Sequence, residues 1–397
     1  MFNFSRDLTV TINGTNRTTE VTEIHIEQRY ETSAGISPQI EIPFATIQLN
    51  TAANIFQNNI VIINVTTLSA HRDATRWPGA IEIFYGKVDQ VDEVVTPFGM
   101  RLVTVTAYSP IRELMTAKVD SLAVAQHAPR SRATSALAAA NAVNWPPTSP
   151  ATIVTQTGTT SGAQMPAQTL TNTKSGDIFQ SAIDAEAGAI VYAPWDTSGD
   201  VFHWFPRGTY PQYTGFAPSP TQTTFFSSTH STSATHFCTT DLVVTKETSN
   251  KYNSIAASLE IDPTIFVNGS NYAACTNNTS ISYYGSVPLD VTLNYHKLST
   301  DNRQYLKDWV DNLNLTKPFA RVQTVSAIAN MRDGYVNGYL VDPYWFMREN
   351  IPVTIQKTYS GNVKKSAQIL DYYFVSGQIQ DITPTSWTVQ YELWKGY

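Results

Sequence analysis

Two histidines and a cysteine are the residues of this chain most suited to hold a metal ion: His230, His236 and Cys238. Zinc binds imidazole nitrogen and thiolate sulfur in such combinations. Their spacing is irregular, however, and the surrounding segment is rich in Pro, Thr and Ser, with Cys275 far along the chain. We therefore expect no metal centre and interpret Cys238 and Cys275 as buried thiols, with a disulfide or a metal clip as the alternative.

Paired carboxylates are the next chemical candidates, because glycoside hydrolysis uses two acids that face one cleft. Asp184 and Glu186 lie two positions apart on a predicted helix, where they point to different faces. Glu260 and Asp262 share one face of a predicted strand, and solvated surface positions explain them. The Walker loop, the dinucleotide-binding glycine pattern and the zinc-protease helix motif are all missing. We expect no catalytic, cofactor-binding or metal-binding residues, and no enzyme.

Aromatic residues make up 11% of the chain and gather in two places. Exposed aromatic rings stack on sugars or anchor protein interfaces. Three interpretations stay open for both clusters: the core of a small domain, subunit contacts, or carbohydrate contact. The first cluster contains Trp195, Phe202, Trp204, Phe205, Tyr210, Tyr213 and Phe216, and the second contains Tyr339, Tyr344, Trp345 and Phe346.

The composition limits the possible partners. Charged residues form only 15% of the 397 residues and the net charge is −6, so Thr, Ser, Asn and Gln carry most of the polarity. Neutral polar groups cost less to bury than charges, which suits permanent packing against neighbours. Nucleic-acid binding needs clustered basic residues, and none occur. We also expect no signal peptide and no membrane span.

The first third of the chain predicts strands, since apolar residues there alternate with polar ones. The alternating sets are Leu8/Val10/Ile12, Ile40/Ile42/Phe44, Ile81/Ile83/Tyr85 and Val103/Val105/Ala107. Residues 60–65 form a continuous apolar run, which predicts a strand covered on both sides. Turn signals such as Asn13-Gly14 and Pro97-Phe98-Gly99 separate the strands, and the pattern indicates a sandwich or a barrel.

Helices are expected to be short. We predict them at 110–115, at 131–143, from the Ser175 N-cap to the Gly188 C-cap, and at 300–313. Residues 148–172 and 208–236 are rich in Thr, Ser and Pro. The first segment is predicted to be an exposed loop, and the second a long loop or an interdomain crossing. Strands are expected again at 242–244, 255–261, 322–328, 351–355, 369–375 and 387–393. The chain thus divides into a β-domain (1–118), a smaller α+β region with long loops (119–239) and a second β-domain with one helix (240–397).

Several segments resemble phage tail-tip (baseplate) hub and minor tail proteins. Residues 84–119 are similar to the strand pair and helix that close the first barrel of those hubs, and 175–208 to their small second domain. Segments 250–260 and 280–286 follow in the family's order. Residues 374–394 resemble a closing hairpin with a Gly-x-x-x-x-Ile-Thr-Pro-x-x-Trp pattern, here Gly377, Pro384 and Trp387. The resemblance covers the chain except for about 145–172 and 208–240.

This resemblance implies a mainly β fold with short helices, in which two tail-tube-like β-barrel domains flank the smaller α+β insert. It implies a virion protein of the tail tip, assembled in the host bacterial cytoplasm as a homotrimer whose six barrels form a pseudo-sixfold ring. The implied partners are the tail tube, distal tail proteins, the tape-measure protein and tip fibre or receptor-binding proteins. No cofactor is implied.

The resulting hypothesis is a structural hub that joins the tail tube to distal tip components and encloses the DNA exit channel. We expect the channel lining to be neutral or acidic, because a basic lining would retain the departing DNA. Two alternatives stay open. A distal tail or tube-like ring protein would form a hexameric ring, and a receptor- or glycan-binding tail protein would expose an aromatic cleft.

Overall fold

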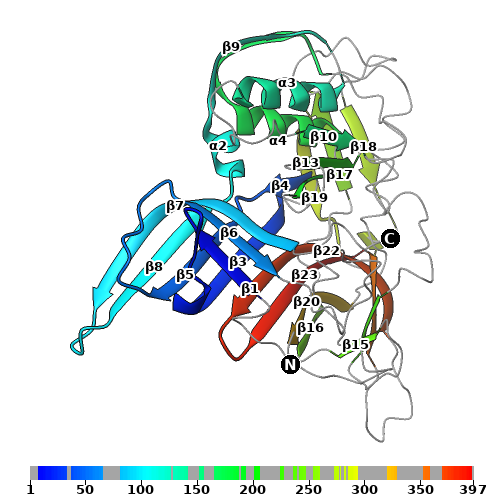
Figure 1. Ribbon diagram of the computed structural model, residues 1–397. Coiled ribbons are helices and arrows are strands. Elements are labelled where there is room, and N and C mark those ends of the chain that lie inside the picture. Colours follow the sequence, from blue (N-terminus) through cyan, green and yellow to red (C-terminus); the bar gives the residue numbers. More distant parts are fainter. Residues whose placement is uncertain are drawn as a thin grey trace, which may run out of the picture.

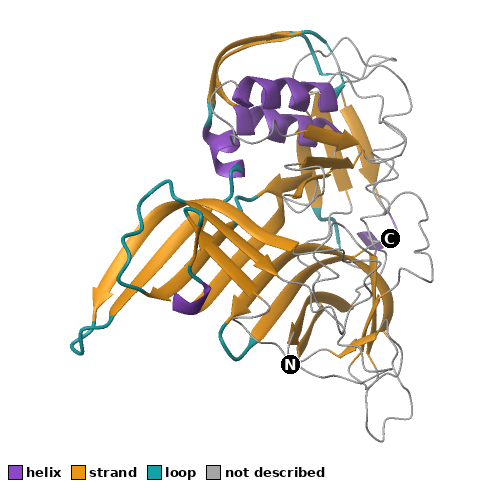
Figure 2. Ribbon diagram, in the orientation of Figure 1, coloured by secondary structure: helices purple, strands orange, loops and turns teal. Residues whose placement is uncertain are grey.

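The structure, a computed structural model, consists mainly of β-strands with a few short helices (Figures 1 and 2). This confirms the predicted fold class. The structure describes residues 8–33, 37–65, 81–126, 128–141, 152–155, 165–186, 189–193, 201–205, 224–227, 236–238, 241–246, 254–259, 272–276, 278, 281–282, 285–293, 320–328, 352–357 and 369–395.

The chain starts with a tight hairpin whose turn is the predicted Asn13-Gly14 pair. Both residues have positive φ, 49° and 75°, as a two-residue turn that follows the strand twist requires. The first strand, β1 (Leu8–Ile12), buries every second side chain, as its alternation predicts. It pairs with the short β2 (Thr15–Asn16), and a single 3-10 turn, η1 (Thr18–Glu20), follows.

One antiparallel sheet contains the N-terminal strands in the spatial order β3-β5-β8-β7-β6-β1. Apolar residues on one side of each strand are buried against one another, and the sheet curls into a half-open barrel around them (Figure 2). Residues 41–43, which include Pro43, lie outside both neighbouring strands, so the prediction of one strand through Ile40, Ile42 and Phe44 was wrong. A proline lacks the N–H that a ladder needs. The strands are β3 (Val21–Ser33), β4 (Ser37–Ile40), β5 (Phe44–Asn50), β6 (Ile60–Val65), β7 (Ile81–Val95) and β8 (Arg101–Tyr108).

The β6 strand corrects a second prediction. Val61 and Ile63 are fully buried, whereas Ile60 and Ile62 are half-buried. The strand therefore has one covered face and one partly open face, although its continuous apolar run predicted two covered faces. The outer side of the barrel sheet is open at this position.

The C-terminal strands extend the same sheet. The first half of β22 pairs with β21, and its second half (377–382) pairs with residues 24–29 of β3. On its other edge β22 pairs with β23, with an irregularity between Val375 and Gly377, and β23 begins at Trp387 after the turn that contains Pro384, as predicted. The added strands are β14 (Thr224–Ser227), β15 (His236–Cys238), β16 (Asp241–Lys246), β20 (Ala320–Ile328), β21 (Pro352–Lys357), β22 (Ile369–Ile382) and β23 (Trp387–Lys395).

The predicted boundaries 1–118, 119–239 and 240–397 stay a prediction. The strand pairing adds that the first and the last of these regions share one continuous sheet through β3 and β22. The strand β14 also lies inside the 208–236 segment, which was predicted to be a loop, so that prediction was wrong at residues 224–227.

The middle region places two helices beside a two-stranded ribbon (Figure 1). The first five residues of one ribbon strand, β11, and all of β10 fall inside the 148–172 segment that was predicted to be a loop, so this prediction was wrong there. The elements that remain to be given are α2 (Ile111–Thr116), β9 (Lys118–Val124), α3 (Pro129–Asn141), β10 (Thr152–Thr155), β11 (Gln168–Lys174), α4 (Ser175–Glu186), β12 (Ala189–Ala193), β13 (Val201–Phe205), β17 (Ser254–Leu259), β18 (Tyr272–Thr276) and β19 (Pro288–Leu293).

Three of the four predicted helices are confirmed, with boundaries shifted by a few residues. Pro110 is the N-cap of α2. Gly188 and the predicted helix at 300–313 lie outside the described residues. Helix α3 carries a fully buried Arg132, whose Nη2 donates a hydrogen bond of 2.5 Å to the carbonyl oxygen of Pro166. Desolvation by burial lowers the pKa of this guanidinium below its ordinary value.

Gly86 in β7 has no room for a side chain. A Cβ at this position would lie 2.6 Å from the carbonyl oxygen of Tyr108 and 2.7 Å from the ring of Phe84. Gly86→Ala is therefore expected to destabilise the fold by about 1–3 kcal/mol, as overpacking of a core does. Chemical denaturation measures the change.

Gly14→Asn is the matched control, because Gly14 has open space around it and a positive φ that Asn tolerates. If Gly86→Ala has the same free energy of unfolding as the wild type, the close approach of β7 and β8 is contradicted.

Candidate functional site

The β7–β8 hairpin projects from the barrel and ends in an apolar tip (Figure 1). Phe98 at the turn is 90% exposed, which is extreme for a large apolar side chain. Scattered apolar residues are normal on a surface, but a cluster of them marks an interaction site. We call this surface the hairpin tip, and it consists of the exposed residues Val94, Val95, Phe98, Met100 and Leu102.

The turn of the hairpin tip is built from local hydrogen bonds. Thr96 N donates to the Met100 carbonyl at 2.8 Å, and Gly99 N donates to the Thr96 carbonyl at 2.9 Å. The Thr96 hydroxyl also accepts a bond of 3.1 Å from Met100 N. Gly99 takes a φ of +77°, which few other residues adopt. The exposed Phe98 is thus presented from an ordered turn.

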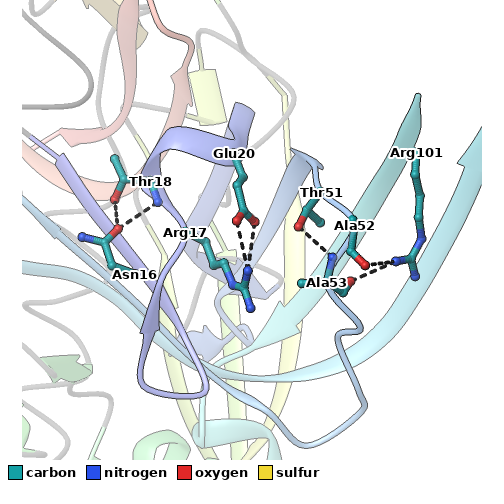
Figure 3. A network of polar contacts seen from close by, with 8 residues as sticks. All are labelled: Asn16, Arg17, Thr18, Glu20, Thr51, Ala52, Ala53 and Arg101. Atoms are coloured by element: carbon teal, nitrogen blue, oxygen red, sulfur yellow. Dashed lines mark hydrogen bonds and ion pairs between the residues drawn. The ribbon is translucent and has the colours of Figure 1, made fainter. Parts of the chain in front are cut away.

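Arg101 clamps the base of this tip (Figure 3). Its guanidinium forms an ion pair with Glu93 across the hairpin and donates to the carbonyl oxygens of Ala52 and Ala53 at 2.9 and 3.1 Å. The planar guanidinium carries several N–H donors in a fixed geometry, so it can bind a carboxylate and carbonyl oxygens at the same time. The hairpin and the β5–β6 loop are therefore fixed relative to each other.

The open face of the barrel sheet is polar and carries carboxylates. Alternation along β3, β5, β7 and β8 puts the apolar residues on the inner face and leaves the others outside. Its exposed or half-buried side chains include Glu23, His25, Glu27, Thr46, Gln48, Gln90, Thr104 and Thr106, with Asp381 from β22. We call this set the polar face.

Cations at the α2 end of the polar face are paired. Lys87 forms an ion pair with Glu113, and Arg112 pairs with Asp89 at 2.7 Å. The Arg112 guanidinium also lies over the Tyr108 ring, 4.3 Å from its centroid. These contacts tie α2 to the barrel, and they neutralise both positive charges at this end of the face.

At the other side of the face, His25 joins the N-terminal and C-terminal parts of the sheet. Its Nδ1 lies 2.6 Å from Asp381 Oδ1, and its Nε2 lies 3.6 Å from Glu27 Oε2. The ring also contacts Phe44, with centroids 6.0 Å apart and planes tilted by 45°.

The residues considered for a metal site lie on two sheets or outside the described residues. His236 and Cys238 lie on β15 of the large sheet, Cys275 lies on β18 of another sheet, and His230 is outside the described residues. Within the described ranges, no group of three or more His, Cys, Asp or Glu is close enough to hold a metal ion. The same part of the chain contains no helix long and apolar enough to cross a membrane.

The carboxylate pairs and the aromatic clusters lie only partly within the described residues. Asp184 and Glu186 both lie on α4, and Glu260 and Asp262 lie outside the described residues. Trp204 on β13 is 1% exposed, which confirms the core interpretation for this member of the first aromatic cluster. Phe202 and Phe205 lie on the same strand; the remaining members of that cluster and the whole second cluster are outside the described residues.

Sequence reasoning missed the hairpin tip. Residues 94–100 read Val-Val-Thr-Pro-Phe-Gly-Met, seven positions without a charge around a Pro-x-Gly turn. Turns are dominated by Gly, Pro, Asn, Asp and Ser, and Pro97 and Gly99 fit this rule. The bulky apolar residues around them, with no charge among them, were the signal that could have identified an interaction surface.

Comparison with known proteins finds similarity in structure alone. No known family profile matches the sequence, and no curated protein matches it. The tail protein from Neisseria meningitidis MC58 superimposes with a TM-score of 0.61 at 10% identity, over 98% of this chain and 97% of that one. The 43 kDa tail protein of prophage MuSo2 from Shewanella oneidensis gives 0.58 at 9% identity, over 98% of both chains. The chain has the fold of phage tail proteins.

A third structure agrees with these two. Prophage tail protein gp18 from Listeria monocytogenes EGD-e gives a TM-score of 0.51 at 9% identity, over 97% of this chain and 94% of that chain. The likeness therefore runs through the whole length of the chain, and the resemblance inferred from the sequence motifs is confirmed at the level of the fold.

The clamp at Arg101 makes a local prediction. Arg101→Gln removes the ion pair with Glu93 and weakens the bonds to Ala52 and Ala53, so the hairpin tip opens more readily. Hydrogen exchange at residues 51–54 and 94–100 is expected to become several-fold faster, while the barrel core keeps its protection.

Thr106→Ser, farther down β8, is the control and should leave exchange at the tip unchanged. Equal exchange in the wild type and in Arg101→Gln would show that the turn holds its shape without the clamp.

Proposed function

We propose that this chain is a structural subunit of a phage tail tip, a hub that joins the tail tube to distal components and encloses the DNA exit channel. The fold supports this, because the chain matches tail proteins over nearly the full length of both partners. The observation that carries the proposal further is the polar face: a broad, open sheet surface of neutral and acidic side chains, on which Lys87 and Arg112 at the α2 end are each paired with a carboxylate.

Such a surface suits the lining of a DNA channel. Double-stranded DNA carries about one negative charge per 1.7 Å of its axis, and basic surfaces hold it by releasing counterions. The polar face offers Thr and Gln side chains with carboxylates among them, and the two cations at its α2 end are neutralised by Glu113 and Asp89. DNA passing over this face meets no net attraction.

The proposed assembly is a homotrimer. The N-terminal strands and the C-terminal strands form two curved parts of one sheet in each chain, so three chains supply six such parts around an axis. A ring of this kind links a sixfold tube on one side to a threefold tip on the other. Its partners are the tail tube, distal tail proteins, the tape-measure protein and tip fibre or receptor-binding proteins.

The proposed role involves binding geometry and no bond-making chemistry. The hairpin tip supports a role in assembly, because exposed apolar clusters of this kind are covered in stable complexes. We expect no turnover of peptidoglycan by the purified chain.

Charge reversal on the polar face tests the channel. Gln48→Lys combined with Gln90→Lys places two cations on exposed positions of β5 and β7, which the intervening strand β8 separates. Particles carrying this variant are expected to assemble normally and to release DNA several-fold more slowly, with the rate recovering at high salt. Dye fluorescence of the ejected DNA measures the rate.

Gln48→Asn with Gln90→Asn is the neutral control. Complete particles that carry the two lysines and eject DNA at the wild-type rate would show that this face does not line the channel.

The copy number tests the symmetry. Electron microscopy of the isolated tail tip is expected to show three copies of the chain around the axis. Six copies would instead favour a distal tail or tube-like ring protein, and a monomer attached to the side of the tail would favour a receptor-binding protein.

A further inference from the structure

Two lysines face each other across the ribbon of β9 and β11. Lys118 and Lys174 are directly opposite in the antiparallel register, and both side chains are exposed. Opposite residues of an antiparallel pair point to the same side with Cβ atoms about 5 Å apart, so like charges there destabilise the pair. In the part of the chain that the structure describes, no carboxylate lies within ion-pair distance of either lysine. An anionic group from outside would relieve this repulsion.

Apolar surface lies close to the two lysines. Ser175 N donates to the Ala117 carbonyl at 2.8 Å, so the ribbon base is joined to the end of α2. Met115 of α2 contacts Gly176 and remains half-buried. Met is an adaptable residue at binding surfaces. The ribbon base, which we define as Met115, Ala117, Lys118 and Lys174, therefore combines apolar contact area with two positive charges.

The hairpin tip has the complementary chemistry. Val94 and Leu102 are cross-strand partners and exposed, and Asp92 lies two residues before Val94, on the same face of β7. One carboxylate oxygen of Asp92 accepts a hydrogen bond of 2.8 Å from the Gln90 side chain, and Asp92 is exposed. The tip thus presents a carboxylate directly beside an apolar pair.

We propose that the hairpin tip of one copy docks on the ribbon base of the next copy, with Asp92 placed between Lys118 and Lys174. This inference rests on the proposed function and gives the ring its subunit contact. The two surfaces lie in different regions of the chain, on the barrel hairpin and on the middle region (Figure 1). Such a contact is head-to-tail, so every copy gives one tip and receives one, and repetition closes a ring.

A lipid surface fits the tip less well than a second copy does. Asp92 and Glu93 stand beside the apolar residues, and bacterial membranes carry anionic lipids that repel carboxylates. The ribbon base supplies the positive charge that a bilayer lacks.

Charge exchange tests the contact with the full-length chain. Asp92→Lys alone, and Lys118→Glu with Lys174→Glu, each bring like charges together in the docked pair. Each is expected to raise the concentration of half-assembly at least about tenfold in sedimentation velocity. The triple variant restores opposite charges in every contact and should return to within about threefold of the wild type.

Glu23→Lys is the matched control, since it changes charge on the same barrel at an exposed residue outside both docking surfaces. Every variant is expected to have the wild-type melting temperature, which shows that its monomer is folded. Phe98→Ser supplies a second, uncharged variant, which should weaken assembly equally at low and at high salt.

The outcomes separate this contact from the proposed function. Rings that form in the wild type and in all charge variants alike would overturn the contact and leave the hub role standing. Rescue by the triple variant in rings of six copies would support the contact and overturn the trimer. Wild-type chains that stay monomeric and bind anionic vesicles through Phe98 would overturn the contact in favour of a membrane-binding tip.

Discussion

The backbone ladder between β3 and β22 is the constraint on which the rest of the structure depends. It pairs residues 24–29 with 377–382, and its buried Gln28–Gln378 contact joins side chains 350 residues apart at 2.6 Å. Closing so long a loop costs conformational entropy, which is recovered only when many contacts form together. Ile24, Ile26 and Ile382 supply that burial, since all three are fully enclosed on the inner face. Without this ladder the barrel would end at β3 with an open edge, and the C-terminal hairpin would lack its support.

Polar groups inside this junction fix the register that the apolar residues alone leave open. A shift by one residue would turn every inner side chain of β22 outward. Gln378 Nε2 donates to Gln28 Oε1, and Trp387 Nε1 donates to Gln380 Oε1 at 3.2 Å. These groups are buried, so a displaced register would leave donors and acceptors without partners at a cost of about 1–3 kcal/mol each. The same ladder places Asp381 opposite His25 on the outer face, which continues the polar face across the junction. The buried hydrogen bonds and the polar outer face therefore both depend on the same register between β3 and β22.

Local patterns predicted the strands well and the long-range pairing poorly. Alternation marked β1, β7 and β8, and the Asn13-Gly14 turn and the Pro384 turn were identified because their backbone geometry depends on the residues themselves. The β11 strand escaped prediction because Gln168–Lys174 is mostly Thr, Asn and Gln, in a ribbon packed on one side only, and so lacks an apolar period. The junction of β3 with β22 leaves no mark in either segment, since pairing partners are chosen by the whole fold. The hairpin tip was missed for another reason: its apolar residues serve no core, and their exposure appears only once the strands are placed.

The free edge of the barrel sheet favours side chains over strand edges as the means of the proposed association. An unpaired edge is a template for uncontrolled pairing with other chains. At β1 the backbone groups of Val10 are already occupied, because its N–H donates to the Thr18 hydroxyl at 2.9 Å and its carbonyl accepts from Arg17 N at 2.8 Å. Asn16 holds Thr18 through two further bonds, and Glu20 pairs with Arg17 (Figure 3). Strand addition at this part of β1 is thereby disfavoured. In the proposed ring, copies would therefore meet through side-chain surfaces, and most of the large apolar side chains that are exposed among the described residues lie on the hairpin tip, held in place by Arg101.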